Sequence, residues 1–264
     1  MLATAPHNNP YPVYGEQPAR EKQELKGCGA GSTQAPLISI VIPTLNEAGT
    51  IVGTLGILQA LRGRSIEIIV IDGGSADRTV ELAGPLADRV KLARRGRAAQ
   101  MNAGAKLARA DILLFLHADT RLPAGFVDLV HGARNGNRVW GRFAVRIETR
   151  NPILWLVASM MNARSRWSGI ATGDQAIFVR RPDFERLGGF PEIPLMEDIA
   201  LSKVLKRVSR PICLSVAVTT SSRRWERHGI VRTIILMWYL RWAYYRGDNP
   251  ARLAAKYGYD VRHE

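Results

Sequence analysis

The segment ILLFLHADT, residues 112–120, joins an apolar run directly to a histidine and an aspartate. A continuous run of branched and aromatic residues is typical of a strand that is buried on both faces of a sheet. In open α/β sheets, ligands bind beyond the carboxyl ends of such strands. Asp119 is therefore expected either to form a turn or to bind a ligand where a central strand ends.

Strand patterns alternate with helix patterns on both sides of this segment. Upstream, we predict strands at residues 38–44, 65–75 and 88–93 and helices at 46–64, 77–87 and 97–110. Downstream, we predict strands at 138–148 and 175–181 and helices at 151–167 and 196–208. Such alternation indicates βαβ units. The expected fold is α/β, a mostly parallel central sheet flanked by helices, with a helical extension at the C-terminus.

The composition suits one large globular domain with an anionic partner. The chain has 264 residues, of which 46% are hydrophobic, and a formal net charge of +14. Residues 203–264 carry 13 Lys and Arg against 4 Asp and Glu. A positive field of this kind favours nucleotides, nucleic acids or anionic membrane surfaces. Cys28 and Cys213 lie far apart, and the first residues lack a secretory signal, so we expect a cytoplasmic protein.

Three segments are expected along the chain. Residues 1–35 are polar and rich in Pro and Gly, which predicts a flexible leader. Residues 36–225 contain the alternating strands and helices and are predicted to form the main domain. Residues 226–264 are predicted to form a basic, aromatic, helical tail.

Three carboxylates occur at equivalent positions of the predicted sheet. Glu47 follows the first strand, Asp72 closes the second and Asp119 follows the fourth. Each one alone is explained by a turn or a helix start, but the ends of parallel strands lie along one edge. Acids gathered there require cations, which indicates a divalent metal that carries phosphates. A basic nucleic-acid-binding α/β protein without catalysis would explain the charge but not these acids, so no nucleic acid is expected.

Five motifs occur in an order that resembles family 2 glycosyltransferases. They are PTLNE (43–47), VIDGGSADRT (70–79), RAAQMNAG (97–104), LHADT (116–120) and MEDIAL (196–201). In finer detail the chain resembles a bacterial branch of transferases associated with radical-SAM and selenium-domain proteins. The resemblance covers about residues 36–225 and implies a GT-A fold, a Rossmann-like sheet that binds a nucleotide-sugar. It implies inverting transfer from a UDP- or GDP-sugar to a hydroxyl acceptor of open identity, lipid-linked acceptors included.

The resemblance also implies donor-binding residues. They are Pro43, Thr44, Asn46, Glu47, Asp72, Gly73, Gly74, Arg97 and Asn102. In this interpretation Asp72 accepts a hydrogen bond from the imide of the base. Gly73 and Gly74 would let the backbone approach the ligand closely.

Asp119 matches the last position of the metal-binding D-x-D motif of the family, but His117 occupies the first. Imidazole is a ligand for transition metals such as Mn²⁺, whereas Mg²⁺ prefers oxygen. Both metals therefore remain open as cofactors. His117 is equally well explained as a neutral, hydrogen-bonded residue.

Asp198 matches the catalytic base of the family, which deprotonates the acceptor hydroxyl. Its neighbour Glu197 would cap the helix or orient an acceptor, and Gly173, Asp174 and Gln175 match the loop on the acceptor side. Arg224 and Trp225 match part of a motif of processive members, and they would lie in a loop near the diphosphate. Ser221 stands where that motif has Gln or Arg, so processive polymerisation is not expected.

Residues 229–257 combine aromatic residues with arginines. The longest uncharged run, Thr233 to Leu240, is far shorter than the roughly 20 residues that a spanning helix needs. One interpretation is a helix that lies on an anionic membrane surface, peripheral to the inner face. The other is a helix that packs on the sheet or on a second subunit of a homodimer.

Overall fold

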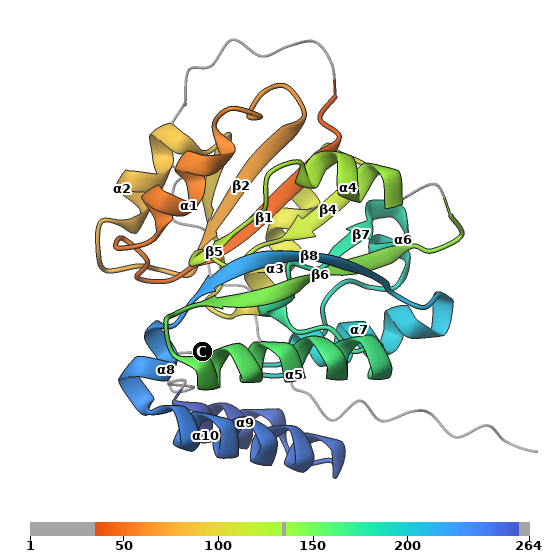
Figure 1. Cartoon of the computed structure of the whole chain (residues 1–264). Coiled ribbons are helices and arrows are strands. Elements are labelled where there is room, and N and C mark those ends of the chain that lie inside the picture. Colours follow the sequence, from red (N-terminus) through yellow and green to blue (C-terminus); the bar gives the residue numbers. More distant parts are fainter. Residues whose placement is uncertain (1–34, 134–135, 259–264) are drawn as a thin grey trace, which may run out of the picture.

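The computed structural model describes residues 35–133 and 136–258 (Figure 1). The leader predicted for residues 1–35, and with it Cys28, therefore lies almost entirely outside the described residues. The strands are β1 (Ile38–Thr44), β2 (Ile66–Asp72), β3 (Arg89–Leu92), β4 (Ile112–Phe115), β5 (Thr120–Arg121), β6 (Trp140–Glu148), β7 (Phe178–Arg180) and β8 (Ile212–Ser221). The α-helices are α1 (Ile51–Leu58), α2 (Thr79–Ala83), α3 (Arg97–Leu107), α4 (Phe126–Ala133), α5 (Pro152–Ser168), α6 (Arg181–Arg186), α7 (Glu197–Val208), α8 (Arg223–His228), α9 (Ile230–Tyr245) and α10 (Pro250–Tyr257).

The strands form one sheet in the order β3-β2-β1-β4-β7-β6-β8-β5. In its first half, β1 pairs in parallel with β2 and β4, and β2 pairs in parallel with β3. Every residue of β1, β2 and β4 is buried, as expected for strands with helices on both faces. The predicted mostly parallel sheet flanked by helices is confirmed. Thr44 lies opposite Asp72, so both strands deliver their following loops to the same edge.

The second half of the sheet contains elements that the sequence patterns missed. β8 pairs in parallel with β6 and in antiparallel orientation with the short β5. Its partners are distant in the sequence, and its residues are only partly buried, so no clean alternation marks it. The predicted strand at 175–181 shrinks to β7, because Gly173–Gln175 forms a 3₁₀ turn, η2.

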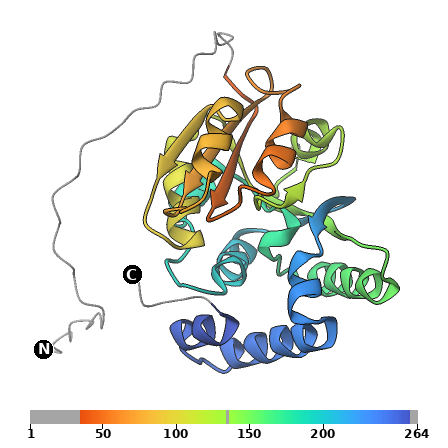
Figure 2. The same cartoon turned by 90° about the vertical axis from the view of Figure 1, so that its left-hand side faces the viewer.

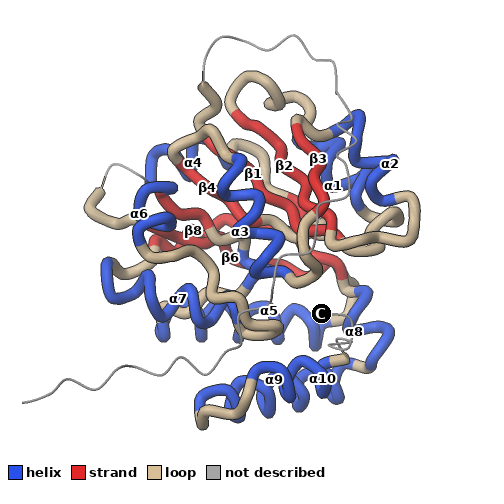
Figure 3. Tube along the Cα trace, turned by 180° about the vertical axis from the view of Figure 1, so that it is seen from behind, coloured by secondary structure: helices blue, strands red, loops and turns tan. Residues whose placement is uncertain are grey.

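Two hydrophobic cores hold helices on opposite faces of the sheet. One core packs α1, α2 and α4 against residues such as Ile40, Ile42 and Leu114. The other packs α3, α6 and α7 against residues such as Val41 and Phe115. Figure 3 shows α3 and α7 on the face that is turned away in Figure 1. The side chains of β1 alternate between the two cores, as the two-residue period of a strand requires.

The C-terminal helices pack on the main domain. Leu240 and Ala243 of α9 are buried with Leu253 of α10 against Ile199 of α7. Figure 2 shows α9 and α10 along the end of the molecule that also carries α5. α8 spans the predicted domain boundary between residues 225 and 226. Within the described part of the chain, no helix combines the length and apolarity that crossing a bilayer requires.

A substitution at Gly104 tests how closely α3 packs on the sheet. A Cβ atom at this position would lie 2.3 Å from Cγ1 of Val41 and 3.1 Å from Cγ1 of Ile71. Replacing glycine by alanine inside a helix normally stabilises it by about 1 kcal/mol. Here the added methyl group must displace β1 or β2, which costs about 1–3 kcal/mol. We therefore expect Gly104→Ala to lower the free energy of unfolding, measured by urea denaturation.

Gly53→Ala is the matched control, because nothing lies within 4 Å of a Cβ at Gly53 in α1. This variant should be more stable than the wild type by about 0.5–1 kcal/mol. Equal stabilisation by both substitutions would contradict the close packing of α3 on the sheet.

Candidate functional site

A cavity of ≈ 920 Å³ opens where β1 and β4 end. Its walls come from the loops that follow these strands, from η2, from the starts of α3 and α7, and from α5, α8 and α9. The predicted site residues that line it are Pro43, Thr44, Asn46, Glu47, Arg97, His117, Asp119, Gly173, Asp174, Asp198, Arg224 and Trp225. The predicted site residues that do not line it are Asp72, Gly73, Gly74, Asn102, Gln175 and Glu197. The structure thus brings most of the predicted residues to one place.

The loops at the sheet edge are held by contacts between them. The backbone N–H of Asn46 donates to Oγ of Ser75 at 2.8 Å, and Oδ1 of Asn46 accepts from the backbone of Ala76 at 2.8 Å. Asn46 has φ 55°, a left-handed conformation that is unfavourable for most residues. Ala176 and Met196, which flank other parts of the cavity, also have positive φ. Backbone strain of this kind clusters at functional sites.

Asp72 shapes the turn that follows β2, and its contact with the base stays a prediction. One carboxylate oxygen accepts hydrogen bonds from the backbone of Gly74 and Ser75, at 2.8 and 2.7 Å. The other accepts from the hydroxyl groups of Thr44 and Ser75, at 3.1 and 2.5 Å. A carboxylate has about four acceptor positions, so these bonds saturate it. Asp72 is also buried, and Gly73 and Gly74 belong to the same turn rather than to the cavity wall.

Asn102 and Gln100, both on α3, hold different parts of the structure. The amide group of Asn102 donates to the carbonyl of Phe190 and accepts from its N–H, at 2.8 and 2.9 Å. Asn102 therefore holds a loop after α6, and its contact with the donor stays a prediction. Gln100 lines the cavity and donates to the carbonyls of Thr44 and Ile71, both at 2.8 Å. No sequence pattern indicated that Gln100 lies in the cavity wall, because its hydrogen-bond partners are on β1 and β2, far from it in the sequence.

Arg97 and Glu197 form an ion pair behind the cavity wall. Nε of Arg97 lies 2.8 Å from Oε1 of Glu197, whose side chain is only 2% exposed. Burial raises the pKa of Glu197 to about 7, and the charge of Arg97 opposes that rise. Glu197 is thus a buried partner of Arg97 and not a group that contacts a ligand in the cavity.

Asp198 is the carboxylate of α7 that faces the cavity. One oxygen accepts a hydrogen bond from the backbone N–H of Gly173 at 2.8 Å, and the other accepts from Ile199 at 2.7 Å. Asp174 also lines the cavity, and its Oδ1 is buried without a hydrogen-bond partner among the described residues. Both acids are therefore part of the cavity wall, and Asp174 keeps unused acceptor capacity.

Gln175 is completely buried, and its assignment to the acceptor side stays a prediction. Its side chain accepts from the backbone of Thr172 and donates weakly to Asn162 on α5. It therefore fixes η2 to the core. Gly173 and Asp174 of the same turn remain in the cavity wall.

His117 lies against the turn that contains Gly173. A Cβ at Gly173 would be 2.5 Å from Nε2 of His117, so this nitrogen is directed at the glycine. Burial lowers the pKa of His117, and Arg97 lowers it further, although Asp119 and Asp198 oppose the shift. The imidazole is therefore neutral near pH 7. Among the described residues, no group of three or more His, Cys, Asp or Glu side chains is arranged to hold a metal.

Glu47 and Asp119 converge on one cationic nitrogen. Nη2 of Arg223, from α8, lies 2.8 Å from Oε2 of Glu47 and 3.6 Å from Oδ2 of Asp119. A cation between these carboxylates is thus compatible with the fold. Mg²⁺ in proteins is commonly held by one or two carboxylates together with substrate phosphates. Glu47 and Asp119 fit such a metal, whereas His117 does not, because its Nε2 is directed at Gly173.

Arg224 and Trp225 anchor the tail. Nη2 of Arg224 donates to the carbonyl of Tyr257 at 3.2 Å, and its guanidinium stacks on the Tyr257 ring at 3.6 Å. Trp225 packs with Leu154 of α5. Sequence analysis assigned Arg224 and Trp225 to a loop near the diphosphate but did not identify Arg223 as the residue that reaches the carboxylates. Its neighbours Arg224 and Trp225 matched a motif, whereas the contact of Arg223 depends on where α8 docks.

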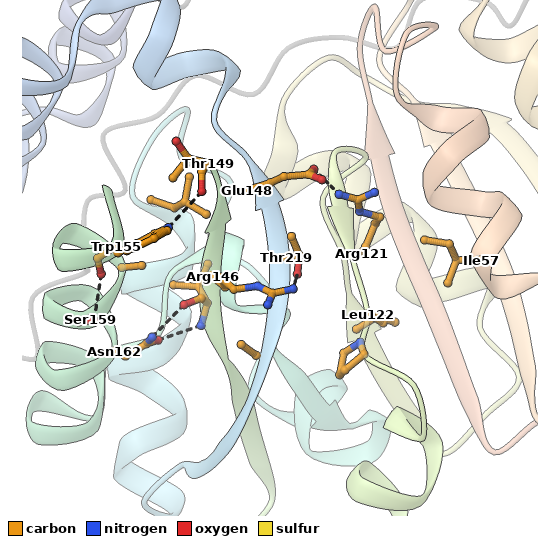
Figure 4. A pocket seen from close by; sticks show the side chains of 15 residues that line it. Ile57, Arg121, Leu122, Arg146, Glu148, Thr149, Trp155, Ser159, Asn162 and Thr219 are labelled. Atoms are coloured by element: carbon orange, nitrogen blue, oxygen red, sulfur yellow. Dashed lines mark hydrogen bonds and ion pairs between the residues drawn. The ribbon is translucent and has the colours of Figure 1, made fainter. Parts of the chain in front are cut away.

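A second cavity of ≈ 830 Å³ lies on the other side of α5, between that helix, β6 and β8 (Figure 4). Figure 4 shows Asn162 bonded to the backbone of β6 and Arg146 bonded to Thr219 at 3.1 Å. Arg121 and Glu148 form an ion pair at its rim. The charged groups here are already paired, so the cavity at the ends of β1 and β4 is the candidate site.

Known proteins resemble this chain in sequence. A sequence model described as Glycosyl transferase family 2 matches residues 39–182. A PGL/p-HBAD biosynthesis glycosyltransferase of Mycobacterium tuberculosis is 34% identical over 131 residues, 40% of this chain and 51% of that protein. An undecaprenyl-phosphate 4-deoxy-4-formamido-L-arabinose transferase of Pseudomonas aeruginosa is 32% identical over 158 residues, 54% of this chain and 46% of that protein. The chain thus spans about half the length of these curated relatives.

Solved structures share the fold at low sequence identity. The mannosyltransferase PcManGT from Pyrobaculum calidifontis, in complex with GDP-Man and Mn²⁺, has a TM-score of 0.57 and 22% identity, covering 80% of this chain and 62% of that chain. S. aureus TarS in complex with UDP has a TM-score of 0.57 and 18% identity, covering 70% of this chain and 60% of that chain. These likenesses confirm the GT-A architecture. Since the family model covers more than half of the sequence, from β1 to the start of α6, the chain belongs to glycosyl transferase family 2.

Proposed function

We propose that the protein is an inverting glycosyltransferase. It moves a sugar from a UDP- or GDP-sugar to a hydroxyl acceptor, with a divalent metal and with Asp198 as the general base. The observation that carries this proposal is that one cavity joins Asp198, at the start of α7, to Glu47 and Asp119 at the strand ends. The molecules bound to the fold relatives, GDP-Man in one and UDP in the other, support a nucleotide-sugar donor.

In the proposed transfer, Asp198 takes up one proton. Its carboxylate accepts the proton of the acceptor hydroxyl while the hydroxyl oxygen forms a bond to the anomeric carbon. The bond from this carbon to the diphosphate oxygen breaks, and the nucleoside diphosphate leaves with the electron pair. Attack from the face opposite the leaving group inverts the anomeric carbon. The hydrogen bond from Gly173 orients the carboxylate for this step.

Asp198 is a better base than Glu197 for a geometric reason. Asp198 lines the cavity, whereas the carboxylate of Glu197 is buried in its ion pair with Arg97. Arg97 faces the cavity, so Glu197 positions a cation that can pair with the donor. Glu197 is therefore a positioning residue.

The donor diphosphate is placed near Arg97, Arg223 and the paired acids. Glu47 and Asp119 would hold the metal, and Thr44 and Asn46 form the adjoining wall for the nucleoside. When bound, Mn²⁺ or Mg²⁺ would neutralise charge that grows on the leaving diphosphate. Arg223 lies against the same two carboxylates, so it would be free to pair with the diphosphate if these residues held a metal.

Asp198→Asn should abolish transfer and preserve donor binding. The amide cannot accept the acceptor proton, so we expect kcat/KM to fall by at least about 10²-fold. Transfer is followed as release of nucleoside diphosphate, and donor binding as a thermal shift. Asp128→Asn, an exposed carboxylate on α4, is the control and should remain active. An active Asp198→Asn enzyme would remove this residue from the role of base.

Asp119→Ala should weaken donor binding only when metal is present. The substitution removes one of the carboxylates that fit the metal, so the thermal shift produced by UDP or GDP with Mn²⁺ should shrink. The small shift produced by nucleotide without metal should change little. His117→Ala is the comparison, and it should retain the metal-dependent shift. Equal loss in both variants would show that His117 is a ligand.

Glu197→Gln should flatten the pH dependence of stability. A carboxyl group with a pKa of about 7 in the folded state and 4.5 in the unfolded state keeps its proton up to a higher pH when the protein is folded. The folded state therefore loses stability as pH rises from about 4.5 to about 7, and this loss is complete above pH 7. We expect the variant to lack that slope when unfolding by urea is measured across this range.

Glu67→Gln is the matched control for that slope. Glu67 is also buried, and burial raises its pKa, but hydrogen bonds from Ser39 and Arg109 together outweigh burial and lower it. Its contribution to stability is lost only as pH falls below about 4.5. The control should therefore keep the wild-type slope between about pH 4.5 and 7, and loss of slope in both variants would contradict the assignment to Glu197.

A further inference from the structure

The candidate cavity extends from Asp198 into a cleft between α5 and α9. Its walls there are apolar: Val157, Met160 and Met161 from α5, and Ile234, Met237 and Trp238 from α9. Figures 1 and 2 both show these two helices side by side at the end of the molecule. A nucleotide and a sugar are polar and need no such walls. The cleft therefore matches a ligand that carries a hydrocarbon chain.

Two arginines lie in this cavity without a counter-ion. Nε and Nη2 of Arg164, on α5, and Nε of Arg241, on α9, are buried and donate no hydrogen bond to any described residue. Neither side chain forms an ion pair within the described residues. Burial and the charge of Arg241 lower the pKa of Arg164 to about 10. Both residues are partly buried, and Nη1 of Arg164 donates a long hydrogen bond to the carbonyl of Ile170 at 3.5 Å. Buried guanidinium nitrogens without acceptors are unfavourable, so the pair indicates a bound anion.

The arginine pair lies beside the proposed base and away from the donor. The charge of Arg164 interacts with Asp174 and Asp198. The donor end of the cavity has its own cations, Arg97 and Arg223. An anion at Arg164 and Arg241 would thus belong to the acceptor. Phosphate suits these residues, because guanidinium groups bind it through paired hydrogen bonds.

The outer faces of the same helices are apolar and exposed. On α9 the exposed residues are Val231, Ile235, Trp238, Tyr239, Trp242 and Tyr245. On α5 they are Ile153, Trp155, Leu156, Met160 and Trp167, the last of which is 92% exposed. Apart from Tyr239 and Trp155, each set recurs every three or four residues, or a multiple of that spacing, and so forms a stripe along its helix. Stripes of this composition, with basic residues nearby, are typical of helices that lie in a bilayer interface.

We propose that the acceptor in the reaction above is a membrane lipid that carries a phosphate group. The phosphate binds Arg164 and Arg241, and the hydrocarbon chain lies between α5 and α9. The hydroxyl that Asp198 deprotonates then belongs to the head group beyond the phosphate. The exposed stripes rest on the bilayer from which the lipid enters. The role of this lipid as the acceptor rests on the proposed function, whereas the lipid-phosphate site itself is inferred from the arginine pair and the apolar cleft.

Calorimetric binding to the full chain tests this site with three probes. They are a short-chain phosphatidylglycerol below its micellar concentration, the matching short-chain diacylglycerol, and glycerol phosphate. We expect the phosphatidylglycerol to bind at least about tenfold more tightly than either of the others, because only it has both the phosphate and the chains. Equal binding of the diacylglycerol would overturn the phosphate site. Equal binding of glycerol phosphate would overturn the lipid.

Substitutions of the two arginines provide a second test of the lipid-phosphate site. Arg164→Gln and Arg241→Gln should each weaken binding of the phosphatidylglycerol by about tenfold and leave that of the diacylglycerol unchanged. Arg232→Gln is the control, because Arg232 is exposed on α9 and does not line the cavity. Unchanged lipid binding in both arginine variants would refute the proposal. If a variant fails to fold, the three probes on the wild-type protein still decide it.

The same preparations separate this inference from the proposed function. The thermal shift with UDP or GDP and Mn²⁺ is measured beside each lipid titration. If the protein shows the thermal shift with nucleotide but does not bind phosphatidylglycerol more tightly than the other two probes, only the lipid acceptor is refuted. Absence of the nucleotide shift with an intact lipid preference refutes the proposed transferase and leaves a lipid-phosphate site.

Discussion

The parallel pairing of β1 with β2 and β4 is the constraint on which the rest of the molecule depends. It fixes Thr44 opposite Asp72 and Val41 opposite Phe115, so three loops begin at one edge. The apolar side chains of these strands fill both cores, which leaves only the strand ends for polar chemistry. Buried strands resist shifts in register, because a slip of one residue exchanges the two faces. The cavity is therefore positioned by the same interactions that stabilise the fold.

Charge balance organises the cavity once the loops are in place. Each acid at the donor end has a cationic neighbour: Arg223 lies between Glu47 and Asp119, and Arg97 pairs with Glu197. At the other end Arg164 and Arg241 form no ion pair within the described residues, although the charge of Arg164 interacts with Asp174 and Asp198. Paired charges are compatible with a stable fold in the absence of ligand, whereas unpaired positive charges favour the binding of an anion. The cavity is thus polar at one end and both cationic and apolar at the other.

The C-terminal helices complete the site rather than extend it. α8 supplies Arg223, and α9 supplies one wall of the cleft together with Arg241. The inner residues Leu240 and Ala243 dock α9 on α7, which carries Asp198. A helix held on one face and apolar on the other can join the base to a surface where lipid is available. This arrangement explains why the helical tail combines arginines with aromatic residues.

The sequence by itself determined the parallel half of the sheet and most of the strand-end residues. Runs such as 112–116 are apolar without interruption, 38–44 is mostly apolar, and Glu47, Asp119 and Asp198 lie in recognisable motifs. β8, α4 and the contacts of Arg223 were decided only by tertiary structure. The same is true of the hydrogen bonds that hold the polar atoms of Asp72, Asn102 and Gln175 against neighbouring segments. Local patterns report burial and chain direction, whereas the partner of a polar side chain depends on which distant segment the fold brings beside it.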